Sequence, residues 1–195
     1  MPSAIWRKKR RIIRHYDRLA STYDTLYKEE QDRKIEHILS HIQLKGSDLV
    51  LDAGCGTGFL FRHIYKQVSN LIGVDLSNGL LRVALQHVKT YGMESVSLIR
   101  ADVDHLPFKQ NVFDNVFALT LLQNSATINI TVQEILRTAK NGSTVVLTGL
   151  KKGFSKKRFI QTLRKERLTF NMIPAPASVK DYLALCSIDH KAKNK

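Results

Sequence analysis

Apolar residues recur along this chain in short runs that alternate with segments of helical periodicity. The runs predict five buried strands, over Leu49–Asp52, Leu71–Asp75, Val96–Arg100, Phe113–Thr120 and Thr144–Leu150. The segments between them predict helices near residues 58–67, 77–91 and 129–139, the last one closed by Asn141-Gly142. Strands that alternate with helices in this way favour βαβ units, in which a parallel sheet carries helices on both faces.

The chain before residue 48 also predicts helical structure. Residues 30–42 carry four apolar side chains at helical spacing, which are Ile35, Ile38, Leu39 and Ile42. Lys45-Gly46-Ser47 follows and ends the predicted helix. The segment Ile5–Arg14 has helix-compatible residues but a short apolar face. It fits either a frayed basic arm or a helix that orders on a partner.

The pattern changes after Leu150. Residues 155–168 predict a strongly basic helix with a narrow apolar stripe of Phe159, Ile160 and Leu163. Leu168–Ile173 and Asp181–Ser187 predict two final strands. The prolines between them leave no room for a crossover helix, so we expect an antiparallel pair.

Length and composition favour one domain. The chain has 195 residues and 43% hydrophobic residues, which is ordinary for a globular protein. We expect a single domain over 1–195, with a basic arm (1–15), a helical cap (16–47), a core (48–187) and a basic tail (188–195). Apolar stretches are too short for a membrane span, no signal-peptide pattern opens the chain, and two cysteines are too few for a disulfide scaffold. These features indicate a cytoplasmic protein.

The net charge of +14 is concentrated at the two ends of the chain. Residues 1–18 carry +6, residues 151–195 carry +9, and the segment between them carries −1. A neutral core with basic ends favours a polyanionic partner that the ends contact. Solvated tails that keep the protein soluble are the alternative explanation.

Three acidic residues and a glycine loop are the candidate ligand-binding groups. Asp52 ends the first strand, and glycines follow at positions 54, 56 and 58. Asp75 ends the second strand, where a carboxylate can accept hydrogen bonds from ribose hydroxyls. Asp102 follows the third strand, where it can accept from an adenine amino group. Carboxyl ends of parallel strands line one crevice, although helix capping would also use such acids.

This combination resembles the class I S-adenosylmethionine-dependent methyltransferases, most of all the type 11 and quinone-biosynthesis-like group. The resemblance implies a Rossmann-like α/β fold with a mostly parallel seven-stranded sheet, a C-terminal antiparallel hairpin and helices on both faces. It implies S-adenosyl-L-methionine as cofactor. Tyr23 lies in a segment similar to one that closes over the cofactor in this family. The resemblance therefore also implies that Tyr23 contacts the cofactor. The implied cofactor-binding residues are Tyr23, Asp52, Ala53, Gly54, Cys55, Gly56, Thr57, Gly58, Asp75, Leu76, Asp102, Val103 and Leu119.

The sequence gives a weaker signal for the residues that face the methyl acceptor. In the family the segment after the fourth strand faces the reactive methyl group, so Gln123 and Asn124 are candidates to position an acceptor, or else polar loop residues. The Asn-Pro-Pro-Tyr signature for exocyclic base nitrogens is missing. Cys186 is expected in the core. The histidines do not group at ligand spacing, so we expect no metal site; His105 is a surface-loop residue or borders the acceptor.

Two kinds of acceptor fit the sequence. The charge map favours RNA, either tRNA or rRNA, contacted by the basic N-terminal arm and residues 151–167, with Trp6, Tyr16 and Phe154 available to stack on bases. A small-molecule acceptor such as a quinone is the alternative. A non-catalytic subunit of a heteromeric methyltransferase is a third class, which the full set of cofactor acids disfavours. An activating protein partner is also expected.

Overall fold

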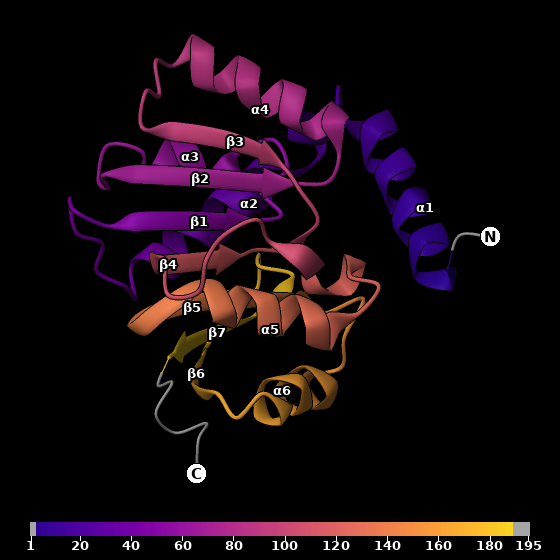
Figure 1. Ribbon diagram of the computed structural model, residues 1–195, viewed down its shortest axis with the longest axis vertical. Coiled ribbons are helices and arrows are strands. Elements are labelled where there is room, and N and C mark those ends of the chain that lie inside the picture. Colours follow the sequence, from indigo (N-terminus) through magenta and orange to yellow (C-terminus); the bar gives the residue numbers. More distant parts are fainter. Residues whose placement is uncertain (1–2, 189–195) are drawn as a thin grey trace.

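The computed structural model describes residues 3–188 and has at its centre one seven-stranded sheet (Figure 1). The strand order is β3-β2-β1-β4-β5-β7-β6. The strands are β1 (Leu49–Ala53), β2 (Asn70–Asp75), β3 (Val96–Arg100), β4 (Phe113–Ala118), β5 (Ala139–Leu150), β6 (Thr169–Ile173) and β7 (Asp181–Ser187). The first five run parallel, and β7 is antiparallel to both β5 and β6. The predicted parallel sheet and antiparallel final pair are therefore confirmed.

Helices cover both faces of this sheet, as predicted. One face packs against α2 (Tyr23–Leu39), α3 (Phe59–Ile64) and α4 (Asn78–Thr90). The other packs against α5 (Ile128–Thr138) and α6 (Lys156–Lys165). Two short 3-10 helices, η1 (Val103–His105) and η2 (Leu122–Asn124), follow β3 and β4. Phe61 and Phe113 are wholly buried in the two layers, and each such side chain contributes roughly 1.5–3 kcal/mol through burial. Cys186 lies in the core as expected.

The junction of α5 and β5 differs from the prediction. Asn141-Gly142 does not close a helix, because α5 ends at Thr138 and β5 begins at Ala139. The pairing of β4 with β5 shifts between Phe113↔Ala139 and Asn115↔Thr144, so the intervening residues bulge. Gly142 has φ +78° in this bulge, and its N–H donates to the Ile188 carbonyl at 2.8 Å. A left-handed glycine marks a strand irregularity here and not a helix end.

The N-terminal segment forms one continuous helix, α1 (Ala4–Leu19), capped by the Ser3 side chain. A frayed arm is therefore wrong for residues 4–15, and the helix crosses the boundary that we expected at residue 15. Figure 1 shows α1 lying across the carboxyl ends of β1, β2 and β3. Asp17 fixes its C-terminal part by accepting hydrogen bonds from Ser77 Oγ (2.6 Å) and Gly79 N (2.8 Å) at the start of α4.

The predicted tail lies almost entirely outside the described residues. Only Ile188 of residues 188–195 is described, and it is buried. Within residues 3–188, no helix combines the length and the hydropathy needed to span a bilayer.

Candidate cofactor site

The glycine loop between β1 and α3 adopts a backbone that other residues rarely reach. Gly54, Gly56 and Gly58 all have positive φ, at +78°, +56° and +83°. A Cβ at Gly58 would also collide with the Phe61 ring. The N–H groups of Gly54 and Cys55 donate to the Val74 carbonyl at 2.7 and 2.9 Å, which anchors the loop on β2. Conformation therefore favours glycine at all three positions, and space adds to this at Gly54 and Gly58.

Asp75 lies at the end of β2 and holds the loop from the other side. Its Oδ2 accepts from Gly56 N at 3.0 Å, and its Oδ1 accepts from Ser77 N at 2.8 Å. Burial raises the pKa of Asp75, while these backbone donors act in the opposite direction. A carboxylate has about four lone-pair sites, so Asp75 keeps acceptor capacity for a ligand hydroxyl. Asp75 thus combines the shaping of the loop with acceptor capacity for a ribose.

Asp52 lies deeper, beneath the same loop. Its carboxyl group is buried, and burial, followed by repulsion from Asp75, raises its pKa to about 8. It lines a small inner cavity together with Tyr23, Cys55 and Thr120. Burial raises the pKa of the Cys55 thiol well above its usual value, so this cysteine is an unreactive wall residue.

A larger cavity of about 120 Å³ opens beside the loop. Gly54 and Gly56 lie at one end, and Asp102 and Val103 lie at the other. Helix α1 lines the cavity with Lys9, Ile12 and Tyr16. Sequence reasoning did not place Lys9 or Ile12 at the site, because the contribution of α1 arises only from its tertiary position.

The Asp102 end of the cavity is closed by an ion pair. Lys9 Nζ lies 2.6 Å from Asp102 Oδ2 and also contacts Asp104. Burial alone would lower the pKa of Lys9, but hydrogen bonds to the two carboxylates outweigh burial and raise it. Asp104 in turn accepts from Thr127 and Thr131 of the opposite wall. Lys9 therefore connects α1 to the floor of the cavity.

These residues fit an adenosine-containing cofactor with an amino-acid end. The glycine cradle leaves open backbone at one end, Asp75 offers ribose acceptors, and Asp102 and Val103 border the far end. Residues 51–147 also match the family model described as a methyltransferase domain. The chain belongs to the class I S-adenosylmethionine-dependent methyltransferases. Its cofactor is S-adenosylmethionine, and its relatives include the quinone-biosynthesis enzymes.

Two curated relatives of this chain are longer proteins. It is 30% identical over 142 residues to an uncharacterised protein of Methanocaldococcus jannaschii, covering 73% of the chain and 53% of the relative. It is 29% identical to a demethylmenaquinone methyltransferase of Symbiobacterium thermophilum, over 79% of the chain and 64% of that protein. The chain thus spans between half and two thirds of the length of these relatives.

Solved structures confirm the predicted Rossmann-like methyltransferase fold. One similar chain comes from the complex between the Haloferax volcanii Trm112 methyltransferase activator and its methyltransferase, with a TM-score of 0.76 and 19% identity. The match covers 90% of the present chain and 98% of that one. A second is an S-adenosylmethionine-dependent methyltransferase from Aquifex aeolicus, with a TM-score of 0.69 and 17% identity, covering 78% and 88% of the two chains.

The structure brings most of the predicted cofactor residues of this methyltransferase to the two cavities. The residues that line one or both are Tyr23, Asp52, Gly54, Cys55, Gly56, Asp75, Leu76, Asp102, Val103 and Leu119. Ala53, Thr57 and Gly58 do not line either cavity. They lie within the same strand and loop, where Thr57 is buried and its carbonyl accepts from His87 Nδ1 at 3.0 Å.

The two acceptor candidates separate. Asn124 lines the large cavity, and its Nδ2 donates to Tyr16 Oη at 2.7 Å. Gln123 lies outside both cavities, where its amide donates to the Thr120 carbonyl and accepts from Leu150 N. Burial raises the pKa of Tyr16, which keeps its hydroxyl protonated at neutral pH. Asn124 therefore faces the large cavity, whereas Gln123 connects the loop after β4 to the end of β5.

Thr120 is a site residue that the sequence did not reveal. It lines both cavities and has φ +54°, which is strained for a β-branched residue. Its hydroxyl accepts from Lys34 Nζ at 2.6 Å, and its N–H donates to Thr148 Oγ1 at 2.7 Å. Lys34 pairs with Asp181 in the core. Only the odd placement of a lysine among the apolar positions of the 30–42 helix could have signalled this network.

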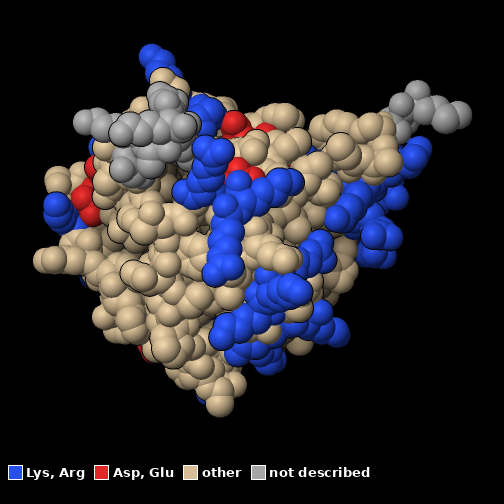
Figure 2. Space-filling view, turned by 90° about the horizontal axis from the view of Figure 1, so that it is seen from below, with Lys and Arg blue, Asp and Glu red and all other residues tan. Residues whose placement is uncertain are grey.

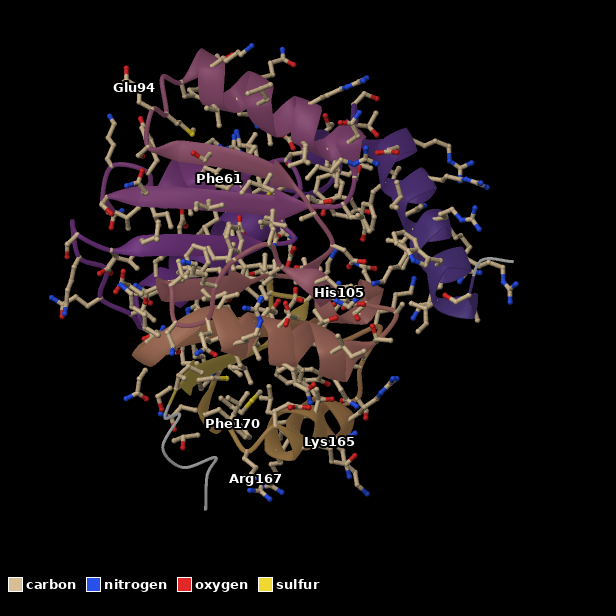
Figure 3. All side chains as sticks on the ribbon, in the orientation of Figure 1. Phe61, Glu94, His105, Lys165, Arg167 and Phe170 are labelled. Carbon is tan, nitrogen blue, oxygen red and sulfur yellow. The ribbon has the colours of Figure 1, made fainter. Side chains whose placement is uncertain are left out.

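The remaining histidine candidate lies outside the site. His105 is labelled in Figure 3 and ends the short helix η1. It is exposed and does not line either cavity. Within residues 3–188, no three His, Cys, Asp or Glu side chains converge as metal ligands.

Proposed function

We propose that this chain transfers a methyl group from S-adenosylmethionine to RNA, either tRNA or rRNA, as one domain that includes α1. The proposal rests on the charge of the exposed surface. Six cations of α1 are exposed: Arg7, Lys8, Arg10, Arg11, Arg14 and Arg18. Nine more are exposed after β5: Lys151, Lys152, Lys156, Lys157, Arg158, Arg164, Lys165, Arg167 and Lys180.

Burial makes this surface more basic than the sequence suggests. Of the acids in the same two described segments, Glu166 and Asp181 are buried, and only Asp17 is exposed. Figure 2 shows Lys and Arg side chains gathered in a band over the α6 side of the molecule, with few acids among them. Such a surface supports contact with a phosphate backbone.

Methyl transfer to such an acceptor is an in-line displacement, in which positioning contributes most of the catalysis. S-adenosylmethionine supplies the electrophilic methyl group when bound. The chain's own contribution is to bind and orient, through Asp75 and the glycine loop on one side and Asn124 with Tyr16 on the other. Thr120 and Lys34 keep the connecting loop in place.

The stacking residues named from the sequence are not equivalent. Phe154 is 3% exposed and packs against Phe159, so it is wrong as a base-stacking residue. Tyr16 faces the large cavity. Trp6 is 48% exposed at the start of α1, close to Lys9, and stays a candidate for stacking on a base.

A small-molecule acceptor is the second candidate. Two similar proteins are named for such acceptors, the demethylmenaquinone methyltransferase and a malonyl-[acyl-carrier protein] O-methyltransferase of Marinomonas. The apolar wall formed by Ile12, Leu119 and Leu121 would accommodate a hydrophobic acceptor. Under this alternative the basic band would contact an anionic membrane surface or have no binding role.

Tritium transfer from labelled S-adenosylmethionine separates the two acceptors. The protein is incubated with total RNA or with a lipid extract, and incorporation is counted in each. Incorporation into RNA alone supports the proposal, and incorporation into lipid alone overturns it in favour of the small-molecule acceptor.

The salt dependence of RNA binding tests the basic band directly. The triple variant carries Lys157→Glu, Arg164→Glu and Arg167→Glu. Its plot of log K for RNA binding against log salt concentration should be less steep by about 2, since each phosphate contact contributes about 0.7 to the steepness on single strands. Lys28→Glu, Lys66→Glu and Lys89→Glu make the same charge change on other exposed elements. Equal slopes for the two triple variants would exclude the band as the RNA surface.

We further propose that an activating protein binds this chain. The Haloferax volcanii neighbour occurs in a complex with the Trm112 methyltransferase activator, which supports a partner of that kind for this chain. Co-expression with a Trm112-type protein should increase tritium incorporation, and an unchanged rate with no co-purification would argue against it.

A further inference from the structure

A third cavity lies between the first turn of α6 and the β6–β7 hairpin, away from the glycine loop. It has a volume of about 310 Å³ and is open to solvent. Its walls are mainly apolar, and two lysines stand at its edge. The lining residues are Lys151, Lys156, Met172, Ile173, Pro174, Ala175, Asp181 and Tyr182.

A buried ion pair links this β6–β7 cavity to the cofactor site. Asp181 lines the β6–β7 cavity, and its Oδ2 lies 2.9 Å from Lys34 Nζ. The same Nζ lies 2.6 Å from Thr120 Oγ1, and Thr120 lines both cofactor-site cavities. A ligand in the β6–β7 cavity would therefore lie beside the loop that follows β4, where the acceptor is expected.

The charge of the β6–β7 cavity favours an anion. Lys34 lies between two carboxylates, 2.9 Å from Asp181 Oδ2 and 3.5 Å from Glu30 Oε2, and offsets one of their two charges. The two lysines at the edge outweigh the other, so the cavity is positive. Lys151 Nζ donates to the Val179 carbonyl at 2.8 Å and lies 6.0 Å from the centre of the Tyr182 ring. Within residues 3–188, neither Lys151 nor Lys156 forms an ion pair with a carboxylate. Lys156 is exposed at the start of α6.

The walls favour a flat apolar body attached to that anion. Tyr182 stacks on Phe159 at 6.0 Å between ring centres, which fixes the ring as a rigid wall. Met172 lies on the neighbouring strand and on the same face of the sheet, two register positions away, since it pairs with Ala184, two residues after Tyr182. A thioether and an aromatic ring are suitable surfaces for a base.

We propose that the β6–β7 cavity binds one nucleotide of the acceptor RNA, with the base against Tyr182 and Met172 and a phosphate at Lys151 and Lys156. The inference rests on the proposed RNA substrate and adds a site that positions the strand beside the reacting nucleotide. The exposed cations of α6 would guide the neighbouring phosphates toward it.

The chain carries a built-in probe for this site. It has three methionines, and Met172 lines the cavity while Met93 is 1% exposed in the core. Methyl-¹³C-methionine NMR, with S-adenosylhomocysteine saturating the cofactor site, therefore reports on the cavity and supplies an internal control. Four test ligands are titrated separately: uridine 5′-monophosphate, uridine, inorganic phosphate and, as a small aromatic anion, 4-hydroxybenzoate.

We expect uridine 5′-monophosphate to shift the Met172 signal in a saturable manner and to leave Met93 unchanged. Uridine and phosphate alone should bind at least fivefold more weakly. Lys156→Ala should weaken nucleotide binding at least fivefold, whereas Lys165→Ala, an exposed cation of the same helix outside the cavity, should change it less than twofold (Figure 3).

Three results would overturn the proposal. They are the lack of a Met172 shift with the nucleotide, equal effects of the two lysine variants on nucleotide binding, or a cavity that binds 4-hydroxybenzoate but does not bind the nucleotide. None of these readouts involves methyl transfer. A negative tritium result on RNA combined with a saturable Met172 shift would therefore disprove the proposed RNA acceptor while the nucleotide site persists.

Discussion

Lys34 Nζ lies 2.9 Å from Asp181 Oδ2 in the interior of the protein, and neither side chain has exposed surface. The pair joins α2 to β7, which are 147 residues apart. Thr148 Oγ1 donates to Asp181 and accepts from Thr120 N, so the four residues form a closed ring of hydrogen bonds. This ring holds Thr120 in its left-handed conformation between the cavities.

Replacing one member of the pair should be strongly destabilising. Lys34→Met leaves the Asp181 carboxylate buried without its cation, and we expect the free energy of unfolding to fall by about 3–5 kcal/mol. Urea denaturation at pH 7 measures the change.

The adjacent Arg33 provides the matched control. Arg33 pairs with Glu29 on the exposed side of the same helix, and Arg33→Met should cost less than about 1 kcal/mol because surface pairs contribute little. The double variant Lys34→Met, Asp181→Leu should recover most of the loss. Similar costs for the two single variants would mean that burial of the pair has no energetic consequence.

Asp75 should be the most sensitive residue for cofactor affinity. Asp75→Ala removes the acceptor of Gly56 N and Ser77 N together with the ribose acceptors. We expect the Kd for S-adenosylhomocysteine, measured by calorimetry, to rise at least 100-fold, in line with the loss of two or more charge-assisted hydrogen bonds. Asp114→Ala at the amino end of β4 removes a carboxylate that accepts from Leu49 N, and should leave the Kd within twofold. An unchanged Kd for Asp75→Ala would refute the assigned role.

The elements that could be predicted from the sequence are those with local signals. The hydrophobic period and the turn residues located the strands and the glycine loop, because Gly54 and Gly56 serve the turn through their own left-handed backbone and Asp75 directly ends its strand. The bulge at Gly142 was misjudged because a left-handed glycine serves helix ends and strand irregularities alike.

The missed site residues depend on long-range contacts. Lys9 reaches Asp102 across 93 positions, and Lys34 reaches Thr120 across 86. A lysine in a basic helix has the same local pattern whether it points to solvent or into a cavity. Sequence periodicity does not encode that difference, so the contribution of α1 to the site emerged only from the structure.

Lys9 should control how firmly α1 closes the cavity. Lys9→Met removes the buried contact of the N-terminal half of α1 with Asp102 and Asp104, while the exposed Lys8 bond to the Ser125 carbonyl persists. We expect amide hydrogen exchange in residues 5–12 to accelerate at least tenfold, while residues 13–19 stay protected through Asp17. Arg10→Met on the exposed side of α1 serves as control. Equal protection in both variants would show that Lys9 does not restrain the helix.

The stability of the cofactor-free protein should fall as pH rises, through Asp52. The pKa of this carboxyl group rises from 3.8 in the unfolded chain to about 8 in the folded protein, because burial and Asp75 disfavour its charge. Between these values the folded state binds more protons than the unfolded state, so the free energy of unfolding decreases with pH, by at most about 1.4 kcal/mol per unit. In Asp52→Asn this dependence is removed, while the contribution of Asp75 persists in both proteins and cancels in the comparison. Urea denaturation at pH 5.5, 6.5 and 7.5 should therefore give a difference between variant and wild type that grows with pH in favour of the variant. Parallel pH profiles would mean that Asp52 is ionised in the folded protein.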